Sequence, residues 1–524
     1  MQMRSLIVSI VAIAFLVLVV GYGSSVGRVA DELPPYWPTD GWQTSTPEEQ
    51  GMDSATLAAL IEYLRDYDGS QVDSLMIIRN GYLIAEVYFY PFAKGSKHDI
   101  ASVTKSFTSS LVGIAIDKGY IGDVEKHVLD FFTDRTIANL DANKQAMTLE
   151  HLLTMQTGFE CIPEPAEVTL MDMVNSPDWV QFTLDLPMSE APGESWVYCS
   201  SAAHLLSAIL GQATNMSTLE FAREHLFGPL GISDVIWPTD PQGVNRGYGD
   251  LCITTDDMAK LGYLYLYHGK WEGQQVLSDT WIRSATQIHV KVSEEIGHGY
   301  TAWFVRDDYG FYGAHGRGGQ AIFVLPDEHL VMVLTGRGPD PPTTKGLIPN
   351  YILPAIKSAG RLPENPEGVA RMQSLVQQVA QPPAEYPQPV PEPPAIAEQV
   401  SGKTYVLEDN PLGLRSISLL VKEEDEAALH VTADGIIAGD AEFEWLIGLD
   451  GIQRIAPGRY GMPAAGKGGW DAHNSFTAEI DEIGNNMIWQ ATLRFDNDQV
   501  TVTLVESSGL YPESIIQGEL ASGM

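Results

Sequence analysis

Hydrophobic residues recur along this chain with two periods, and each period predicts one kind of element. Steps of three and four residues predict amphipathic helices over 54–67 and from 107 to 118, the second ending in a lysine and a glycine. Two strand-like runs, over 74–78 and 82–90, flank an Asn-Gly turn and predict a β-hairpin. A helix, a hairpin and a second, buried helix in this order predict a sheet covered by helices.

The middle of the chain continues with helices and strands. A short helix is expected over 148–158, where His151 packs or caps rather than catalyses, and a longer helix over 201–210 follows the loop 192–200. Strands are expected over 299–305, 320–325 and 330–335. The glycine-rich segment 314–320 either lets a ligand approach the backbone or forms a flexible hairpin, and the pattern favours neither.

The carboxy-terminal part has a different composition. After a predicted helix over 366–381, a proline-rich run indicates a stiff, extended linker within 362–395. Short alternating runs separated by Gly, Asp and Asn then predict a small antiparallel β domain over 396–524, of a kind that closes into barrels. These runs lie at 416–421, 428–432, 476–480, 487–495 and 499–505, and the Asp-Asn-Asp sequence 496–498 is interpreted as a hairpin turn rather than a calcium loop.

An apolar run over 6–20, interrupted by one serine, follows Arg4 near the amino terminus. Such a run is typical of an export signal or of an uncleaved membrane anchor within 1–30, and the sequence does not decide between them. In both cases the rest of the chain is expected to be exported: extracellular, periplasmic or held at the outer face of the cytoplasmic membrane.

Charge and cysteine content exclude several classes of function. The chain has 524 residues with 31 Lys or Arg and 68 Asp or Glu, and its net charge of −37 argues against nucleic acid and anionic membrane surfaces as partners. Cys161, Cys199 and Cys252 are odd in number and widely spaced, which predicts neither a disulfide framework nor a zinc ribbon. Because no His-Glu-x-x-His or Walker-type loop occurs, no metal and no cofactor are expected.

A Ser-x-x-Lys sequence lies at the start of the helix that begins before residue 107. Asp99 is placed to cap this helix, and Ser102 and Lys105 are one turn apart on the same face. A primary amine beside a serine can take its proton, and a helix amino terminus favours a developing oxyanion. This spacing arises by chance roughly once or twice in a chain of this length, so its interpretation depends on the surrounding sequence.

Four segments in a fixed order resemble those of a known family. They are Ser102-x-x-Lys105, the stretch 151–158, Pro-Gly-Glu-Ser-Trp-Val-Tyr198 before a helix, and the glycine-rich strand entry near His315. Together they resemble the serine β-lactamase and penicillin-binding-protein superfamily, specifically the class C branch with its related esterases and nylon-oligomer hydrolases. The resemblance covers about residues 42–358 and implies an α+β, β-lactamase/transpeptidase-like fold, in which helices flank an antiparallel sheet beside a helical subdomain.

The resemblance also implies roles for the residues that match the family's motifs. Ser102 would be the nucleophile, Lys105 its activating amine, and Tyr198 a group that moves protons between serine, leaving group and water. Which of Lys105 and Tyr198 takes the first proton stays open. The implied substrate-binding residues are Ser200, His315, Arg317, Gly319 and Gln320, and the oxyanion hole would combine the Ser102 N–H with a backbone N–H near Gly319 or Gln320.

Two departures from the family's motifs bear on the substrate. The second motif, usually Tyr-x-Asn, reads Tyr198-Cys199-Ser200, and the third, usually Lys-Thr-Gly, is best matched by 315–317 to within one or two positions. Both changes remove groups that hold a lactam, so they favour an esterase or amidase over a β-lactamase. Arg317 either binds a substrate carboxylate or is a surface arginine.

The resulting hypothesis is an exported serine hydrolase that cleaves a small-molecule ester, amide or peptide through an acyl-enzyme. The alternatives are a D-amino-acid peptidase acting on cell-wall peptides and a non-catalytic binding or sensor protein on the same fold. The β domain is expected to wall one side of the cleft. The sequence predicts no oligomeric state.

Overall fold

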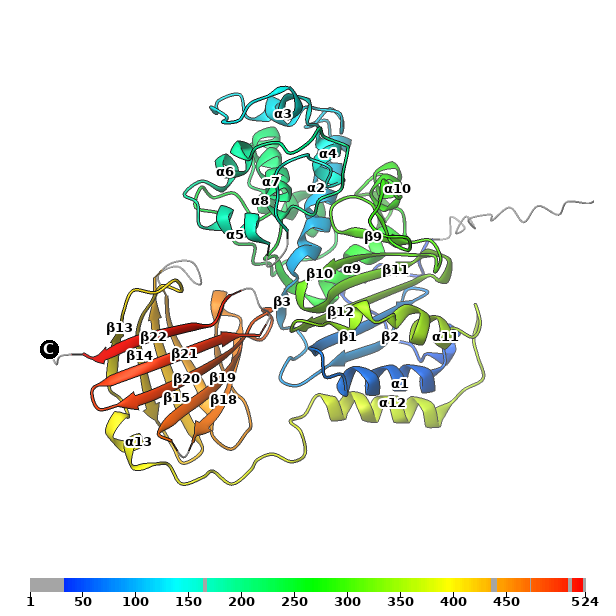
Figure 1. Ribbon diagram of the computed structural model, residues 1–524. Coiled ribbons are helices and arrows are strands. Elements are labelled where there is room, and N and C mark those ends of the chain that lie inside the picture. Colours follow the sequence, from blue (N-terminus) through cyan, green and yellow to red (C-terminus); the bar gives the residue numbers. More distant parts are fainter. Residues whose placement is uncertain (1–32, 164–166, 435–440, 472, 508–510, 522–524) are drawn as a thin grey trace, which may run out of the picture. The chain divides into compact units, whose positions relative to one another are not determined.

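The computed structural model describes residues 33–163, 167–434, 441–471, 473–507 and 511–521 (Figure 1). The predicted export signal or anchor within 1–30 lies outside these residues. Within the described part of the chain, no helix is both long enough and apolar enough to cross a membrane.

An antiparallel sheet forms the centre of the first 360 residues. Its described strands lie in the order β2-β1-β12-β11-β10-β9-β8-β7. Their bounds are β1 (Gln71–Arg79), β2 (Tyr82–Tyr88), β7 (Val290–Lys291), β8 (Gly297–His298), β9 (Trp303–Arg306), β10 (Phe311–Gly316), β11 (Gln320–Leu325) and β12 (Leu330–Arg337). Two small two-stranded sheets lie outside it. In one, β3 (Lys97–Asp99) pairs with β4 (Cys252–Thr254), and in the other, β5 (Lys270–Trp271) pairs with β6 (Gln274–Gln275).

The predicted hairpin is confirmed, and three strands of this sheet, β7, β8 and β10, were not predicted. Asn80 and Gly81 have φ angles of 52° and 87°, the left-handed pair that a two-residue hairpin turn requires. The segment predicted as a strand entry or flexible hairpin contains the end of β10, which pairs with both β9 and β11. Glycines at 313 and 316 hide this strand because they interrupt its alternating pattern.

Both faces of the sheet are buried, as the pattern of helices and strands predicted. In β1, Met76 and Ile78 belong to one apolar core while Leu75 and Ile77 belong to the other. Figure 1 shows α1 and α12 together on one face, with α2 and α9 on the other. The helices are α1 (Ser54–Arg65), α2 (Thr104–Asp117), α3 (Ala142–Ala146), α4 (Leu149–Leu153), α5 (Val168–Val174), α6 (Trp179–Asp185), α7 (Ser200–Thr214), α8 (Thr218–Ala222), α9 (Thr255–Leu266), α10 (Asp279–Thr286), α11 (Leu353–Ala355) and α12 (Pro366–Val379).

Local capping signals explain where two of these helices begin. The Ala101 N–H donates to Asp99 Oδ1 at 2.8 Å, so Asp99 satisfies the first N–H of the short 3-10 turn Ala101–Val103 that precedes α2, while the N-cap position itself is Ile100. At α4, the Thr148 N–H donates to His151 Nδ1 at 3.1 Å. His151 is therefore a capping residue, as predicted.

The carboxy-terminal part is a closed β barrel, entered through α13 (Ala395–Val400). Its described strands are ordered β16-β15-β14-β13-β22-β21-β20-β19-β18-β17, and a parallel pairing of β16 with β18 closes the barrel. The strands are β13 (Thr404–Leu407), β14 (Leu414–Val421), β15 (Glu426–Ala433), β16 (Ala441–Gly448), β17 (Arg454–Pro457), β18 (Pro463–Trp470), β19 (Ser475–Asp481), β20 (Ile488–Asp496), β21 (Gln499–Glu506) and β22 (Ser514–Leu520).

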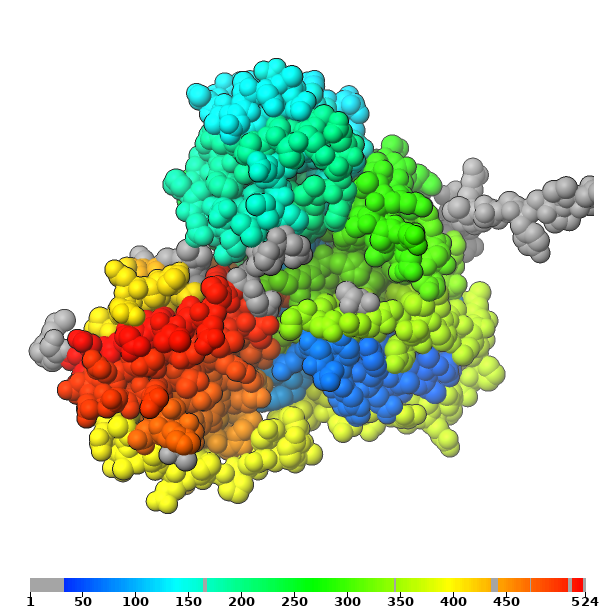
Figure 2. Space-filling model, in the orientation of Figure 1, coloured from blue at the N-terminus to red at the C-terminus, as the bar shows by residue number. Residues whose placement is uncertain are grey.

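The turn between β19 and β20 joins the barrel to the segment that precedes α2. The Asp99 N–H donates to the Gly484 carbonyl at 2.5 Å, and Asn486 Nδ2 donates to Asp99 Oδ2 at 3.4 Å. Gly484 has φ 80°, and a Cβ there would lie 2.2 Å from the Lys97 carbonyl oxygen. Only glycine lets the two backbones approach this closely. Figure 2 shows the orange and red barrel strands packed beside the green and blue surface of the sheet.

Candidate active site

Ser102 lies in the single 3-10 turn between β3 and α2. The preceding Ala101 has φ 45°, a left-handed conformation uncommon for a residue with a Cβ. It is held by the hydrogen bond from its N–H to Asp99 and by the bond from the Ile100 N–H to the Leu251 carbonyl at 2.9 Å. This turn presents the Ser102 hydroxyl at the amino end of a buried helix.

Two side chains donate hydrogen bonds to the Ser102 hydroxyl. Lys105 Nζ lies 2.9 Å and the Tyr198 hydroxyl 2.7 Å from Ser102 Oγ. Lys105 is completely buried, and its Nζ also donates to the Tyr248 carbonyl at 2.7 Å. The structure therefore brings together the three residues that the resemblance assigned to catalysis. A base on either side of Ser102 can take its proton.

A disulfide holds the second motif. Cys199, between Tyr198 and Ser200, is bonded to Cys161, whereas Cys252 is a free, buried thiol. The prediction that the cysteines form no disulfide is therefore wrong. Three cysteines leave the pairing undetermined in the sequence, and only folding brings 161 and 199 together.

Removing this disulfide is expected to destabilise the protein by about 3–4 kcal/mol, because the cross-link closes a loop of 38 residues in the unfolded chain. Thermal unfolding of Cys161→Ser with Cys199→Ser measures the effect. Cys252→Ser is the matched control, since it removes a buried thiol without removing a bond. Equal melting temperatures for the double variant and the wild-type protein would contradict the expectation.

The third motif approaches Ser102 at Gly316, the last residue of β10. A Cβ on Gly316 would lie 3.1 Å from the Ser102 nitrogen and 2.8 Å from the Ile100 carbonyl oxygen. The match of Lys-Thr-Gly to 315–317 would place the motif's glycine at position 317. The glycine that faces the nucleophile is instead Gly316, one position earlier. The missing side chain leaves the Ser102 N–H accessible from the strand.

Three of the expected substrate-binding residues do not line the cavity beside Ser102. The His315 ring packs against Phe323 at a centroid distance of 5.0 Å, and burial lowers the pKa of His315 to about 4. The Gln320 side chain donates to the Gly336 carbonyl at 2.5 Å and to Asn486 Oδ1 at 2.6 Å. Gly319 and Gln320 are not among the residues that line the cavity. The chain folds back at Gly318, which has φ 80°, and Gln320 then pairs with Gly316 at the start of β11.

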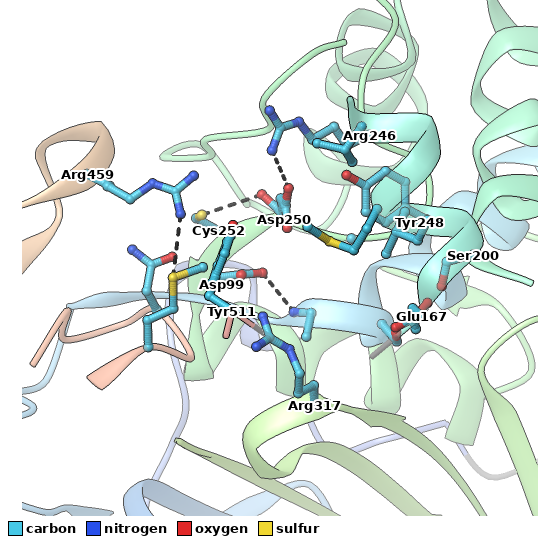
Figure 3. Close-up of a pocket in the computed structure, with 18 of the residues that line it drawn as sticks. Asp99, Glu167, Ser200, Arg246, Tyr248, Asp250, Cys252, Arg317, Arg459 and Tyr511 are labelled. Atoms are coloured by element: carbon cyan, nitrogen blue, oxygen red, sulfur yellow. Dashed lines mark hydrogen bonds and ion pairs between the residues drawn. The ribbon is translucent and has the colours of Figure 1, made fainter. Parts of the chain in front are cut away.

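Ser200 and Arg317 do line this cavity, which has a volume of about 110 Å³ (Figure 3). The Ser200 hydroxyl is buried and has no hydrogen-bond partner among the described residues. The barrel contributes a wall as well, as the sequence led us to expect. Its lining residues are Arg459, Tyr460, Asn485, Met487 and Tyr511.

Charged groups in the cavity are partly paired. Arg246 Nη1 donates to Asp250 Oδ2 at 2.5 Å, and this guanidinium lowers the pKa of Asp250 against the effect of its burial. Burial, with the Asp250 charge nearby, raises the pKa of Asp99 to about 6. Among the described residues, no group of three or more His, Cys, Asp or Glu side chains is arranged to hold a metal ion.

Sequence reasoning missed several of these lining residues. Tyr248 accepts a hydrogen bond from Lys105 through its backbone carbonyl, and a backbone contact leaves no signal in the sequence. Arg246 and Asp250 belong to no recognisable motif. The barrel residues are far from Ser102 along the chain, so only the folded barrel places them beside it.

The fold and this site define a serine hydrolase. The chain belongs to the beta-lactamase family, whose model matches residues 57–353. Its sequence is 24% identical over 336 residues to 6-aminohexanoate-dimer hydrolase of Paenarthrobacter ureafaciens, covering 60% of this chain and 84% of the relative.

The chain is also similar, at low identity, to two solved structures. The octameric penicillin-binding protein homologue from Pyrococcus abyssi is 16% identical, with a TM-score of 0.43, over 89% of this chain and 99% of that one. A family VIII carboxylesterase is 14% identical, with a TM-score of 0.45, over 64% of this chain and 98% of that one.

Proposed function

We propose that this hydrolase cleaves a carboxylic ester or a small amide through a covalent acyl-enzyme on Ser102. The observation that carries the proposal is the pair of hydrogen bonds that end on Ser102 Oγ, from Lys105 and from Tyr198. The similarity to a relative named 6-aminohexanoate-dimer hydrolase supports hydrolysis of a small molecule.

The reaction has two halves. Ser102 Oγ bonds to the substrate carbonyl carbon while its proton moves to an unprotonated Lys105 or Tyr198, and the leaving alcohol or amine departs with that proton. Water then attacks the acyl-enzyme and gives a proton to the same base. The acid product leaves as Ser102 regains its proton.

Ester hydrolysis by Ser102→Ala tests this proposal. The variant is expected to lose turnover of phenyl esters, whereas Ser106→Ala is expected to keep it. Ser106 lies on α2, and its buried hydroxyl has no hydrogen-bond partner among the residues that the structure describes. Equal turnover by Ser102→Ala and the wild-type enzyme would refute the proposal. Release of D-alanine from a cell-wall stem peptide, without ester turnover, would favour the peptidase alternative.

The oxyanion hole is expected to include the Ser102 N–H beside Gly316. Gly316→Ala should lower kcat about 10²- to 10³-fold, because its Cβ would occupy the space next to that N–H. Alanine can adopt the φ of Gly316, −135°, but the added Cβ would also press on the Ile100 carbonyl oxygen, 2.8 Å away. Steady-state kinetics on a phenyl ester measure the effect, with Gly360→Ala, whose Cβ would meet no atom within 4 Å, as the control. An unchanged kcat in Gly316→Ala would show that the oxyanion does not bind at the Ser102 N–H beside Gly316.

We further propose that the chain is exported. The Cys161–Cys199 disulfide suits an oxidising compartment, and the apolar run over 6–20 suits an export signal or anchor. Fractionation of cells that express the full chain, and the chain lacking 1–30, tests this. Retention of both forms in the cytoplasm with reduced cysteines would contradict it.

A further inference from the structure

The barrel supplies an arginine to the wall of the Ser102 cavity. Arg459 lies in the short turn Arg459–Gly461 between β17 and β18, where Tyr460 has φ 55°. In Figure 3 its guanidinium enters the cavity from the barrel side, whereas Ser200 lies on the opposite wall. A molecule bound between these walls would be next to Ser102.

The Arg459 guanidinium forms no close ion pair within the described residues. Its Nη2 donates to the Tyr460 hydroxyl at 3.3 Å, and its Nη1 lies 4.0 Å from Met487 Sδ. Its Nε is shielded from solvent and has no hydrogen-bond partner in the described part of the chain. Glu482 is the carboxylate with the strongest influence on Arg459, yet it accepts a hydrogen bond from Asn485 at 3.2 Å instead. A guanidinium in such a position can still bind a carboxylate through charge-assisted hydrogen bonds.

Two of the carboxylates that line this cavity have other hydrogen-bond partners. Asp250 is paired with Arg246, and Asp99 accepts the Ala101 N–H. Arg317 adds a second positive charge to the same wall region, and its charge, like that of Arg459, lowers the pKa of Asp250. The guanidinium groups of Arg459 and Arg317 therefore both line the cavity where the barrel meets the third motif.

We infer that Arg459 binds a carboxylate of the substrate, so that the enzyme prefers esters or amides that carry a free carboxylate. This inference rests on the proposed hydrolase function. It makes Arg459 a specificity-determining residue supplied by the barrel, and it gives the barrel a direct part in substrate recognition.

Three esters of one chain length test the inference. Phenyl hexanoate is neutral, monophenyl adipate carries a carboxylate on the acyl side, and 3-carboxyphenyl hexanoate carries one on the alcohol side. The wild-type enzyme should prefer at least one anionic ester over the neutral one. Arg459→Gln should lower kcat/KM for that ester about tenfold to hundredfold, mainly through KM, and leave phenyl hexanoate within about twofold.

Arg494→Gln is the matched control, because it removes one positive charge from an exposed position on β20. No preference for either anionic ester, or equal losses on all three esters in Arg459→Gln, would overturn the inference and leave the hydrolase function standing.

If the wild-type enzyme hydrolyses none of the three, the proposed function fails. Calorimetric binding of adipate and 3-hydroxybenzoate then decides the inference. Binding that Arg459→Gln abolishes supports it, and no binding, or equal binding by both proteins, overturns it.

Discussion

Lys105→Met is expected to lower kcat for ester hydrolysis about 10³- to 10⁴-fold, because it removes a base that contacts the nucleophile. The amine lies 2.9 Å from Ser102 Oγ and is completely buried. Lys105→Arg should not restore activity, since a guanidinium stays protonated and cannot accept the serine proton. Steady-state kinetics on phenyl hexanoate measure both variants.

Lys144→Met is a closely matched control for this experiment. Lys144 is also completely buried, and its Nζ donates to the Ala138 and Leu184 carbonyls at 2.9 and 2.8 Å. Its loss removes similar hydrogen bonds away from Ser102. Equal loss of kcat in the two methionine variants would show that burial of the lysine, rather than its place beside Ser102, explains the effect.

Arg337→Met is expected to destabilise the protein by about 3–5 kcal/mol, because it leaves two buried carboxylates without their cation. Arg337 at the end of β12 pairs with Asp73 of β1, and its Nη2 lies 2.7 Å from Asp481 of the barrel. All three side chains are at most 1% exposed. The midpoint of urea unfolding measures the loss, and Arg361→Met, which breaks an exposed pair with Glu49, should shift it far less. Equal shifts of the urea midpoint in the two variants would contradict the role of Arg337 as the cation that stabilises these buried carboxylates.

The buried cluster of Asp73, Arg337 and Asp481 also makes the stability of the protein depend on pH. Burial raises the pKa of Asp481 from the ordinary aspartate range to about 7. The Asp481 carboxyl therefore binds its proton more tightly in the folded protein than in the unfolded chain. The stability that this protonation contributes is lost as the pH rises from about 4 to about 7. Asp481→Asn should show a smaller fall in unfolding midpoint between pH 5 and pH 8. Parallel midpoint curves for the variant and the wild-type protein would contradict this.

Local signals predicted much of the fold. The Asn-Gly turn at 80–81 carries its own left-handed preference, and the periodicity after Ser102 predicted a helix that the structure places over Thr104–Asp117. The β-lactamase-like fold was predicted correctly from the resemblance of four motifs to the family. The all-β domain was predicted correctly from alternation and turn residues, which reflect burial directly.

Long-range contacts account for what the sequence did not reveal. The Cys161–Cys199 pairing depends on proximity in the folded chain. The glycine beside Ser102 is Gly316, which leaves space next to the Ser102 N–H because it has no Cβ. The sequence contains several glycines here and does not show which of them lies beside Ser102. Arg459 lines the cavity only because the turns of the barrel meet the nucleophile's segment.

The most direct test of the account is the intact mass of residues 31–524 after incubation with a fluorophosphonate serine probe. The wild-type protein should gain the mass of one probe adduct, Ser106→Ala should gain the same mass, and Ser102→Ala should gain none. An unmodified wild-type protein that is shown to be folded, or an adduct of equal yield on Ser102→Ala, would contradict the assignment of Ser102 as the activated nucleophile.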